Sequence, residues 1–166
     1  QIVRTPFAEV PLRLEIREGL RRDSQELLQA QFAGLVLHEL NQFSPDPLVL
    51  VRRAIEPGYG LWVFPGGYVD RGEEITAAAL REAKEESGLD VRIDGLINVY
   101  SYAEAGPIII VYAATALSGE LCGDDECLEA GLFTPDAIPW GALAFRSTGD
   151  ALRDYFRNEW YSSKLK

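Results

Sequence analysis

Runs of apolar residues along the chain predict a β-sheet of several strands. Residues 33–38 and 48–51 are almost continuously apolar, which is typical of buried strands. Residues 91–99 and 108–116 are rich in β-branched and aromatic side chains, which also favour strands. Further strands are expected at 10–16, where apolar and polar residues alternate, and at 61–64 and 132–133.

Three segments have helical patterns. Residues 76–87 are rich in Ala, Glu, Lys and Arg, and Gly88 directly after them is the residue type that commonly ends a helix. Residues 148–160 predict a closing amphipathic helix, and 23–31 have helical composition and spacing. Turns are expected at 41–47, 57–60 and 135–140. Because strands and helices are mixed without regular βαβ alternation, the pattern predicts an α/β fold with a mixed sheet.

The chain length fits one ordinary domain. We therefore expect residues 1–166 to form a single domain, with residues 1–32 as an N-terminal strand-and-helix arm. The sequence does not define the role of this arm. Since strands dock on exposed sheet edges, the arm is a candidate for the contact of a homodimer.

Composition and charge narrow the function. The formal net charge is −10, from 26 acidic and 16 basic residues, which argues against a nucleic-acid partner but not against an anionic substrate reached through a divalent cation. Cys122 and Cys127 are too few for a disulfide framework and, with a distant His38, lack zinc-site spacing. With no secretory signal visible and no apolar run of ~18 residues, we expect a cytoplasmic protein without membrane contact.

The helix expected at 76–87 carries a cluster of acids near its C-terminal end. Glu82, Glu85 and Glu86 are related by i+3 and i+4 steps, so they share one face of the helix. They precede Gly88, at the end where the helix dipole disfavours negative charge. Arg81 can pair with Glu85 at i+4, which compensates in part. The residues alone leave two interpretations open, a solvated charged face and a cation site, and oxygen ligands would suit Mg²⁺ or Mn²⁺.

Glycines precede this helix. Gly66 and Gly67 follow the strand expected at 61–64, and together with Pro65 they predict a sharp break in the backbone. Glycine also allows a backbone group to approach a ligand closely. Gly72 predicts a second turn just before the helix.

Residues 67–89 match a known motif, written G-x5-E-x7-R-E-U-x-E-E-x-G-U with U an apolar residue. The fixed positions are filled by Gly67, Glu73, Arg81, Glu82, Glu85, Glu86 and Gly88, and the apolar positions by Ala83 and Leu89. Similarity to the surrounding stretches extends over roughly residues 33–140. The chain therefore resembles the Nudix hydrolase superfamily.

This resemblance implies an α/β/α sandwich that hydrolyses a nucleoside diphosphate linked to another group, with Mg²⁺ as cofactor and Mn²⁺ as a substitute. The metal ligands that it implies are the carboxylates of Glu82, Glu85 and Glu86 and the carbonyl of Gly66. It also implies that Glu73 and Arg81 brace the loop against the helix, which a guanidinium–carboxylate fork does well.

The implied reaction is attack of water on phosphorus, for which a carboxylate must accept a proton. Glu82 or Glu85 could serve within the helix. In many relatives the base comes from a downstream loop, where Glu126 is the first candidate here. Asp124, Asp125, Glu129 and Glu104 are further candidates.

The substrate is less defined than the reaction. Residues 56–67 and 138–145 resemble the branch that acts on ADP-ribose and on dinucleotides such as NADH or FAD. A nucleoside triphosphate is the alternative substrate, and a non-catalytic nucleotide-sensing module is the alternative class. Isopentenyl diphosphate isomerases share the fold but need a catalytic cysteine, and Cys122 and Cys127 lie in the wrong region for that role. The aromatic side chains available for base stacking are Phe7, Phe32, Tyr59, Trp62, Tyr68, Tyr100, Tyr102, Phe133 and Trp140.

Overall fold

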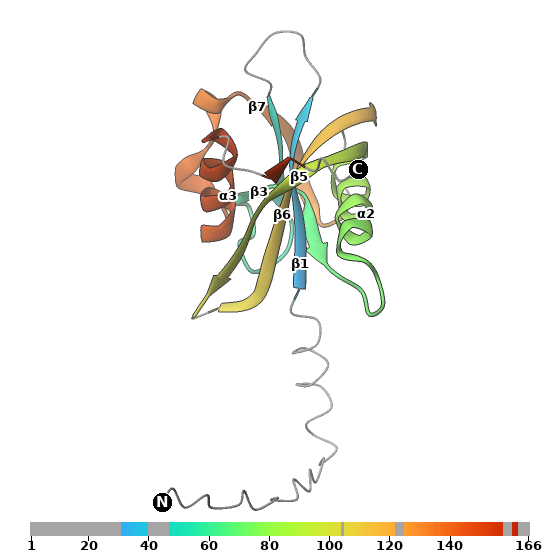
Figure 1. Cartoon of the computed structure of the whole chain (residues 1–166). Helices are drawn as coiled ribbons and strands as arrows, with labels where there is room; N and C mark the ends of the chain where they lie inside the picture. Colours follow the sequence, from blue (N-terminus) through green and yellow to red (C-terminus); the bar gives the residue numbers. More distant parts are fainter. Residues whose placement is uncertain (1–30, 40–46, 104, 122–124, 158–160, 163–166) are drawn as a thin grey trace, which may run out of the picture.

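The computed structural model describes residues 31–39, 47–103, 105–121, 125–157 and 161–162 (Figure 1). The strand predicted at 10–16 lies outside these residues, as does the helix predicted at 23–31 except for its last residue, which begins a strand. The turn predicted at 41–47 lies outside them apart from residue 47. A single domain with an arm at 1–32 stays a prediction.

One mixed sheet of eight strands forms the centre of the molecule. Its strands are β1 (Gln31–Glu39), β2 (Leu48–Arg53), β3 (Trp62–Val63), β4 (Gly66–Tyr68), β5 (Leu89–Tyr102), β6 (Ala105–Gly119), β7 (Cys127–Phe133) and β8 (Tyr161–Ser162). They follow the order β3-β2-β1-β6-β5-β8, with β4 also paired to β1 and β7 to β2. β1 and β6 run parallel and the other pairs antiparallel, so the predicted mixed sheet is confirmed.

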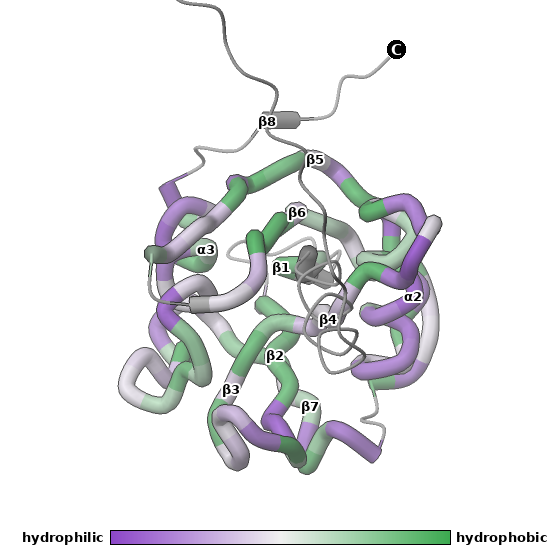
Figure 2. The backbone as a smooth tube through the Cα atoms, turned by 90° about the horizontal axis from the view of Figure 1, so that it is seen from below, coloured by the Kyte–Doolittle hydropathy of each residue, from purple (hydrophilic) through white to green (hydrophobic). Residues whose placement is uncertain are grey.

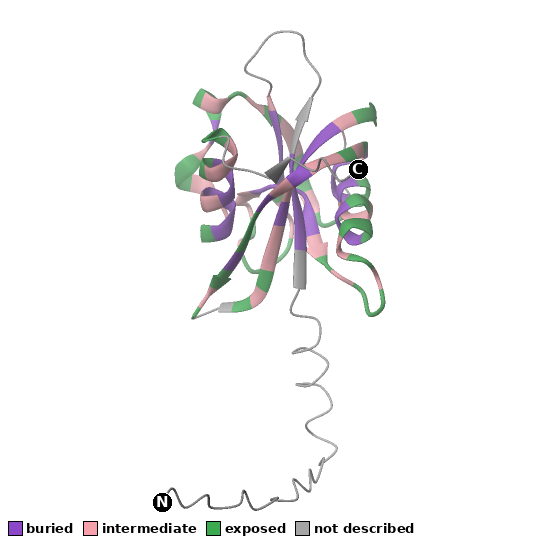
Figure 3. Cartoon of the chain, viewed as in Figure 1, coloured by how far each residue is buried: buried purple, intermediate pink, exposed green. Residues whose placement is uncertain are grey.

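A helix covers each face of the sheet (Figures 1 and 2). Helix α2 (Ile75–Ser87) lies on one face and α3 (Arg146–Phe156) on the other, and two short 3-10 turns, Pro135–Ala137 and Trp140–Ala142, precede α3. Figure 3 shows that the buried residues of both helices line the sides turned to the sheet. This is the predicted α/β/α sandwich.

Side chains that alternate between the two faces of the central strands form a hydrophobic core on each face of the sheet. On β1, Leu35 belongs to the core under α2 and Val36 to the core under α3, because successive strand residues point to opposite faces. The helix side of the α2 core consists of Ala78, Ala79 and Ala83, all fully buried. These small side chains let α2 lie close to the sheet, which limits the distance that its glutamates must span to reach β4.

Several elements are longer or shorter than the sequence pattern predicts. β5 and β6 extend well beyond 91–99 and 108–116, and β7 has seven residues where two were expected. Long antiparallel pairing between β5 and β6 carries both strands past their apolar centres. Helix α3 begins two residues before position 148 and ends at Phe156.

The predicted backbone break at Pro65-Gly66-Gly67 is confirmed only at Pro65, a bend that separates β3 from β4. Gly66 and Gly67 form part of strand β4, which pairs with Gly34 and Ala33 of β1. Positive φ occurs at Gly72 but at neither Gly66 nor Gly67. Gly34, the partner of Gly66 on β1, serves close packing, because a Cβ on it would overlap the ring of Phe64.

Candidate active site

Helix α2 ends where the sequence predicts, and its end is tightly fixed. Gly88 adopts a left-handed conformation with φ of 74°, and its N–H donates to the Lys84 carbonyl at 3.0 Å. The Lys84 ammonium donates to the Gly88 carbonyl and to Asp90, each at 3.0 Å. β5 begins at Leu89, so the last turn of α2 is held directly against the sheet.

Glu73 and Arg81 form a two-pronged ion pair between the loop before α2 and the helix. Arg81 Nε donates to Glu73 Oε1 and Nη2 to Oε2, both at 2.9 Å. Arg81 Nη2 also donates to the Tyr68 carbonyl at 3.2 Å, which ties the end of β4 to the same group. The Arg81 hydrogen bonds, aided by the Asp70 N–H, lower the pKa of Glu73 to about 2. The fork therefore holds the loop with an acid that stays ionised.

The remaining nitrogen of Arg81 joins two of the proposed metal ligands. Nη1 donates to Glu82 Oε1 at 2.7 Å and to Glu85 Oε2 at 3.0 Å. All five N–H groups of the guanidinium are thus used, one on Nε and two on each terminal nitrogen. The Glu73 hydrogen bonds are the main reason that the pKa of Arg81 rises above its usual range.

Glu82 lies in a tight place beneath β4. Only 15% of its side chain is exposed, and a Cβ on Gly67 would overlap its carboxyl group. Gly67 therefore makes room for Glu82. Burial raises the pKa of Glu82, the Arg81 contacts lower it, and the charges of Glu85 and Glu126 raise it.

The other two acids of the helix face have different surroundings. Glu86 is buried and accepts a hydrogen bond from the Gly66 N–H at 2.8 Å. Half of the Glu85 side chain, 52%, is exposed. Within the described part of the chain, no group of three or more acidic, His or Cys side chains converges as a ready metal cage. Arg81 brings Glu82 and Glu85 together, while Glu86 is turned to the β4 backbone.

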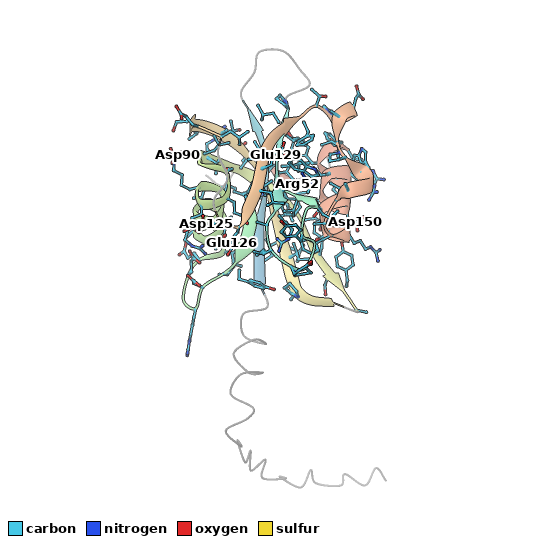
Figure 4. All side chains as sticks on the ribbon, turned by 180° about the vertical axis from the view of Figure 1, so that it is seen from behind. Arg52, Asp90, Asp125, Glu126, Glu129 and Asp150 are labelled. Atoms are coloured by element: carbon cyan, nitrogen blue, oxygen red, sulfur yellow. The ribbon has the colours of Figure 1, made fainter. Side chains whose placement is uncertain are left out.

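Glu126 lies near enough to this acidic face for its charge to act on Glu82. Its carbonyl accepts the Ala54 N–H at 2.7 Å, which anchors the loop to the end of β2. Figure 4 shows Asp125 and Glu126 on the α2 side of the sheet, whereas Glu129 lies further along β7 next to Arg52. The Arg52–Glu129 pair is 3.8 Å apart. Of the downstream candidates, Glu126 is the one whose charge acts on Glu82; Asp124 and Glu104 lie outside the described residues.

Sequence reasoning missed Arg53. This arginine is half-buried, donates from Nε to the Pro57 carbonyl at 2.9 Å and lies over the Phe145 ring at 5.1 Å. Among the described residues, no carboxylate lies within ion-pair distance of it, in contrast to Arg52 and Arg81. The available signal was an Arg-Arg pair directly after a buried strand in a chain of charge −10.

The aromatic candidates separate by exposure. Tyr59 and Tyr68 are more than half exposed, at 57% and 56%. Tyr100 is buried and donates its hydroxyl to Asp154, so it packs in the core. Phe7 and the side chain of Phe32 lie outside the described residues, as does Cys122. Cys127 is half-buried.

A mixed sheet between two helices, with glutamates of one helix gathered around an arginine, is the architecture of the Nudix class. The family model described as NUDIX domain matches residues 29–152, about three quarters of the chain. The chain belongs to the Nudix hydrolase family. Enzymes of this family generally use a divalent cation, and named relatives act on nucleotide derivatives.

Two curated relatives and one solved structure illustrate the similarity. An ADP-ribose pyrophosphatase of Methanocaldococcus jannaschii is 35% identical over 116 residues, 68% of this chain and 67% of that protein. The NAD-capped RNA hydrolase NudC of Pseudomonas aeruginosa is 28% identical over 71% of this chain, which spans 45% of the relative's length. A NUDIX hydrolase from Nitrosomonas europaea superposes with a TM-score of 0.69 at 30% identity, covering 77% of this chain and 70% of the other. Among the described residues, no helix is long and apolar enough to cross a membrane.

Proposed function

We propose that this chain hydrolyses the diphosphate linkage of ADP-ribose, or of a dinucleotide such as NADH or FAD, with Mg²⁺ as cofactor. The observation that carries the proposal is the convergence of Glu82 and Glu85 on one guanidinium nitrogen. Three carboxylates, with Glu73 included, surround a single positive charge, so the cluster has an excess of negative charge. A divalent cation can balance that excess.

The donor set fits Mg²⁺. This ion prefers oxygen ligands, keeps several waters and usually takes only one or two protein carboxylates together with substrate phosphates. Glu82 and Glu85 each have a second oxygen beyond the one bonded to Arg81. Glu86 and the Gly66 carbonyl are proposed as further ligands, because the Gly66 N–H holds Glu86 at the same seam between α2 and β4. When bound, the ion would stabilise charge on the phosphates and lower the pKa of a bound water.

Glu126 is the proposed general base. Glu82 and Glu85 already accept hydrogen bonds from Arg81 and are proposed ligands of the ion. Glu126 comes from a separate loop, and its charge acts on Glu82. The hydrogen bond from Ala54 fixes the backbone of Glu126, which helps to keep its carboxylate in one place. Glu82 and Glu85 remain the alternatives for this role.

Arg53 is the proposed contact for the anionic substrate. A half-buried guanidinium with no carboxylate partner in the described part of the chain can form charge-assisted hydrogen bonds with a phosphate. Its packing over Phe145 and its bond to Pro57 hold the group in place before substrate arrives. The identity to an ADP-ribose pyrophosphatase supports the choice of substrate.

A substrate panel tests this function. ADP-ribose, NADH, FAD, other nucleoside diphosphate derivatives and nucleoside triphosphates are each incubated with Mg²⁺ or Mn²⁺, and the products are separated by chromatography. We expect release of AMP from ADP-ribose or a dinucleotide. No turnover across the panel overturns the hydrolase proposal, and turnover of triphosphates alone overturns the substrate.

Matched variants test the residues. Glu85→Gln should lose activity while Glu120→Gln, an exposed acid outside the site, keeps it. Glu126→Gln should lose activity while Glu129→Gln, which faces Arg52, keeps most of it. Full activity of Glu85→Gln contradicts the ligand assignment, and full activity of Glu126→Gln contradicts the base assignment.

A cytoplasmic location and a homodimer are proposed alongside this function. The first is supported by a sequence with only two cysteines, which is too few for a disulfide framework. Size-exclusion chromatography with light scattering tests the second.

A further inference from the structure

We infer that Arg81 has a second role besides bracing the loop: it is a resident counter-cation that competes with the divalent ion for Glu82 and Glu85. This inference rests on the proposed metal site. It predicts that Arg81 sets the ion concentration at which that site fills.

The hydrogen bonds of Arg81 place positive charge between the two carboxylates that would hold the ion. Nη1 contacts one oxygen of Glu82 and one oxygen of Glu85, at 2.7 and 3.0 Å. An ion held by both carboxylates would therefore lie close to a guanidinium nitrogen of like charge. At this separation the repulsion is large even in the partly hydrated surroundings of a protein surface.

Arg81 cannot simply swing away from the two acids. Its Nε and Nη2 atoms are bonded to Glu73, and Nη2 also holds the Tyr68 carbonyl. The guanidinium is planar and rigid, so these contacts fix the direction of Nη1 as well. An ion bound by both acids would therefore compete with Nη1 for their negative charge while the fork to Glu73 stays in place.

The competing charge is also useful before the ion binds. Glu82 is 15% exposed beneath Gly67, and a buried carboxylate without a cationic partner is strongly destabilising. Arg81 keeps Glu82 and Glu85 in position in the ion-free protein. The Arg81 contact thus positions the two acids, which favours ion binding, and repels the ion, which lowers the affinity of the site for it.

Neighbouring residues provide matched controls. Glu73→Gln weakens the same fork as Arg81→Gln but leaves the positive charge of Arg81 in place. Lys84→Gln removes one positive charge from the same helix, and the Lys84 ammonium is bonded to Gly88 and Asp90, away from Arg81. Glu73→Gln therefore reports the effect of losing the brace, and Lys84→Gln reports the effect of losing one positive charge elsewhere on the helix.

Ion binding is measured directly, by isothermal titration with Mg²⁺ and by electron paramagnetic resonance with Mn²⁺, without substrate. We expect Arg81→Gln to bind the ion at least about tenfold more tightly than wild type, because a nearby like charge is gone. Lys84→Gln should change the affinity by less than about twofold, since an exposed charge is screened. Glu73→Gln should bind no more tightly than wild type. Despite its tighter ion binding, Arg81→Gln should hydrolyse substrate more slowly because the loop is no longer braced.

Each failure has a separate meaning. If wild type binds neither ion, the proposed metal site is overturned. If wild type binds but Arg81→Gln and Glu73→Gln both bind more weakly by similar factors, Arg81 is only a brace and this inference is overturned.

A measurement on wild type protects the test against a variant that fails to fold. The side-chain N–H signals of Arg81 are followed by NMR during the Mg²⁺ titration. We expect them to shift, and the Nη1 protons to exchange faster with water, with the midpoint of ion binding. Signals that stay unchanged at saturating ion overturn the inference.

Discussion

Helices α2 and α3 each carry acidic residues spaced three or four positions apart, but the hydrogen-bond partners of these acids differ. On α3, Asp150 and Asp154 are one turn apart and accept hydrogen bonds from the Tyr102 and Tyr100 hydroxyls of β5, at 2.9 and 2.8 Å. Arg146 lies 3.4 Å from Asp150 and stacks over the Tyr102 ring. Arg157 lies 3.9 Å from Asp154, so each aspartate has a neutral donor as well as a nearby arginine.

On α2, Glu82 and Glu85 share one nitrogen of Arg81, whose other donors are used elsewhere. Spacing along a helix therefore does not distinguish an acid that fastens the helix to the sheet from an acid that can bind a cation. Acids satisfied by several fixed donors fasten a helix to its sheet. Acids that share a single cation keep the capacity to bind another.

The largest expected effect is on catalysis at α2. Glu82→Gln should lower kcat/KM by at least about 100-fold, because a proposed ligand of the divalent ion loses its charge and the ion would no longer stabilise the charge of the reacting phosphates. Steady-state kinetics on ADP-ribose measure it. The control is Asp154→Asn on α3, which should keep the wild-type rate per folded molecule. A comparable loss in both variants would show that the two helices do not differ as described.

The next effect concerns the glycine above Glu82. Gly67→Ala should destabilise the fold by about 1–3 kcal/mol, because the new methyl group overlaps the Glu82 carboxyl. Its activity should also fall, since the displaced carboxylate no longer meets Arg81. Urea unfolding and kinetics check both. Gly141→Ala, where a Cβ meets no atom within 4 Å, should leave stability and activity near wild type.

On α3 the expected effect is on stability. Tyr100→Phe should destabilise the protein by about 1–2 kcal/mol, because a hydrogen bond to a charged group is lost. Asn98 also donates to Asp154 at 3.1 Å, which limits the loss. Urea unfolding measures the change, and kcat should not move. Tyr59→Phe, at an exposed ring, should fall within about 0.5 kcal/mol of wild type.

The smallest expected effects concern how stability changes with pH, which should differ between the contacts of α2 and those of α3. The pKa of Glu73 is lowered from 4.5 to about 2, so its stabilising contribution is present above pH 4.5 and lost as the pH falls toward 2. Burial, followed by the Asp150 contact, raises the pKa of Tyr102 from 10 to about 12, so its contribution is present below pH 10 and lost as the pH rises toward 12.

Unfolding midpoints of wild type, Glu73→Gln and Tyr102→Phe across pH test this pair of predictions. Glu73→Gln should flatten the acid limb alone, and Tyr102→Phe the alkaline limb alone. A change in the opposite limb would contradict the assignment of these contacts.

The local sequence pattern was sufficient to predict those parts of the structure that depend on residues close together in the chain. The apolar runs, the helix over 76–87 and its end at Gly88 depend on periodicity and on a left-handed glycine, which the sequence displays directly. The motif also identified Glu73 and Arg81 as a pair, although they are eight residues apart.

Tertiary structure decided every partner that comes from another element. The register of β4 on β1 makes Gly66 and Gly67 a strand and turns the Gly66 N–H to Glu86. The antiparallel run of β5 beside α3 makes two tyrosines the partners of α3 acids.

The sequence by itself determined which side chains share a helix face, because 3.6 residues per turn places i, i+3 and i+4 together. Only the folded sheet decided what that face meets. The Ala-lined side of α2 lies close to the sheet beside β4, and the Ala54 N–H holds the backbone of Glu126 at the end of β2. Hydrogen bonds between elements depend on strand order and register, which are set by packing of the whole domain, and a local pattern does not encode them.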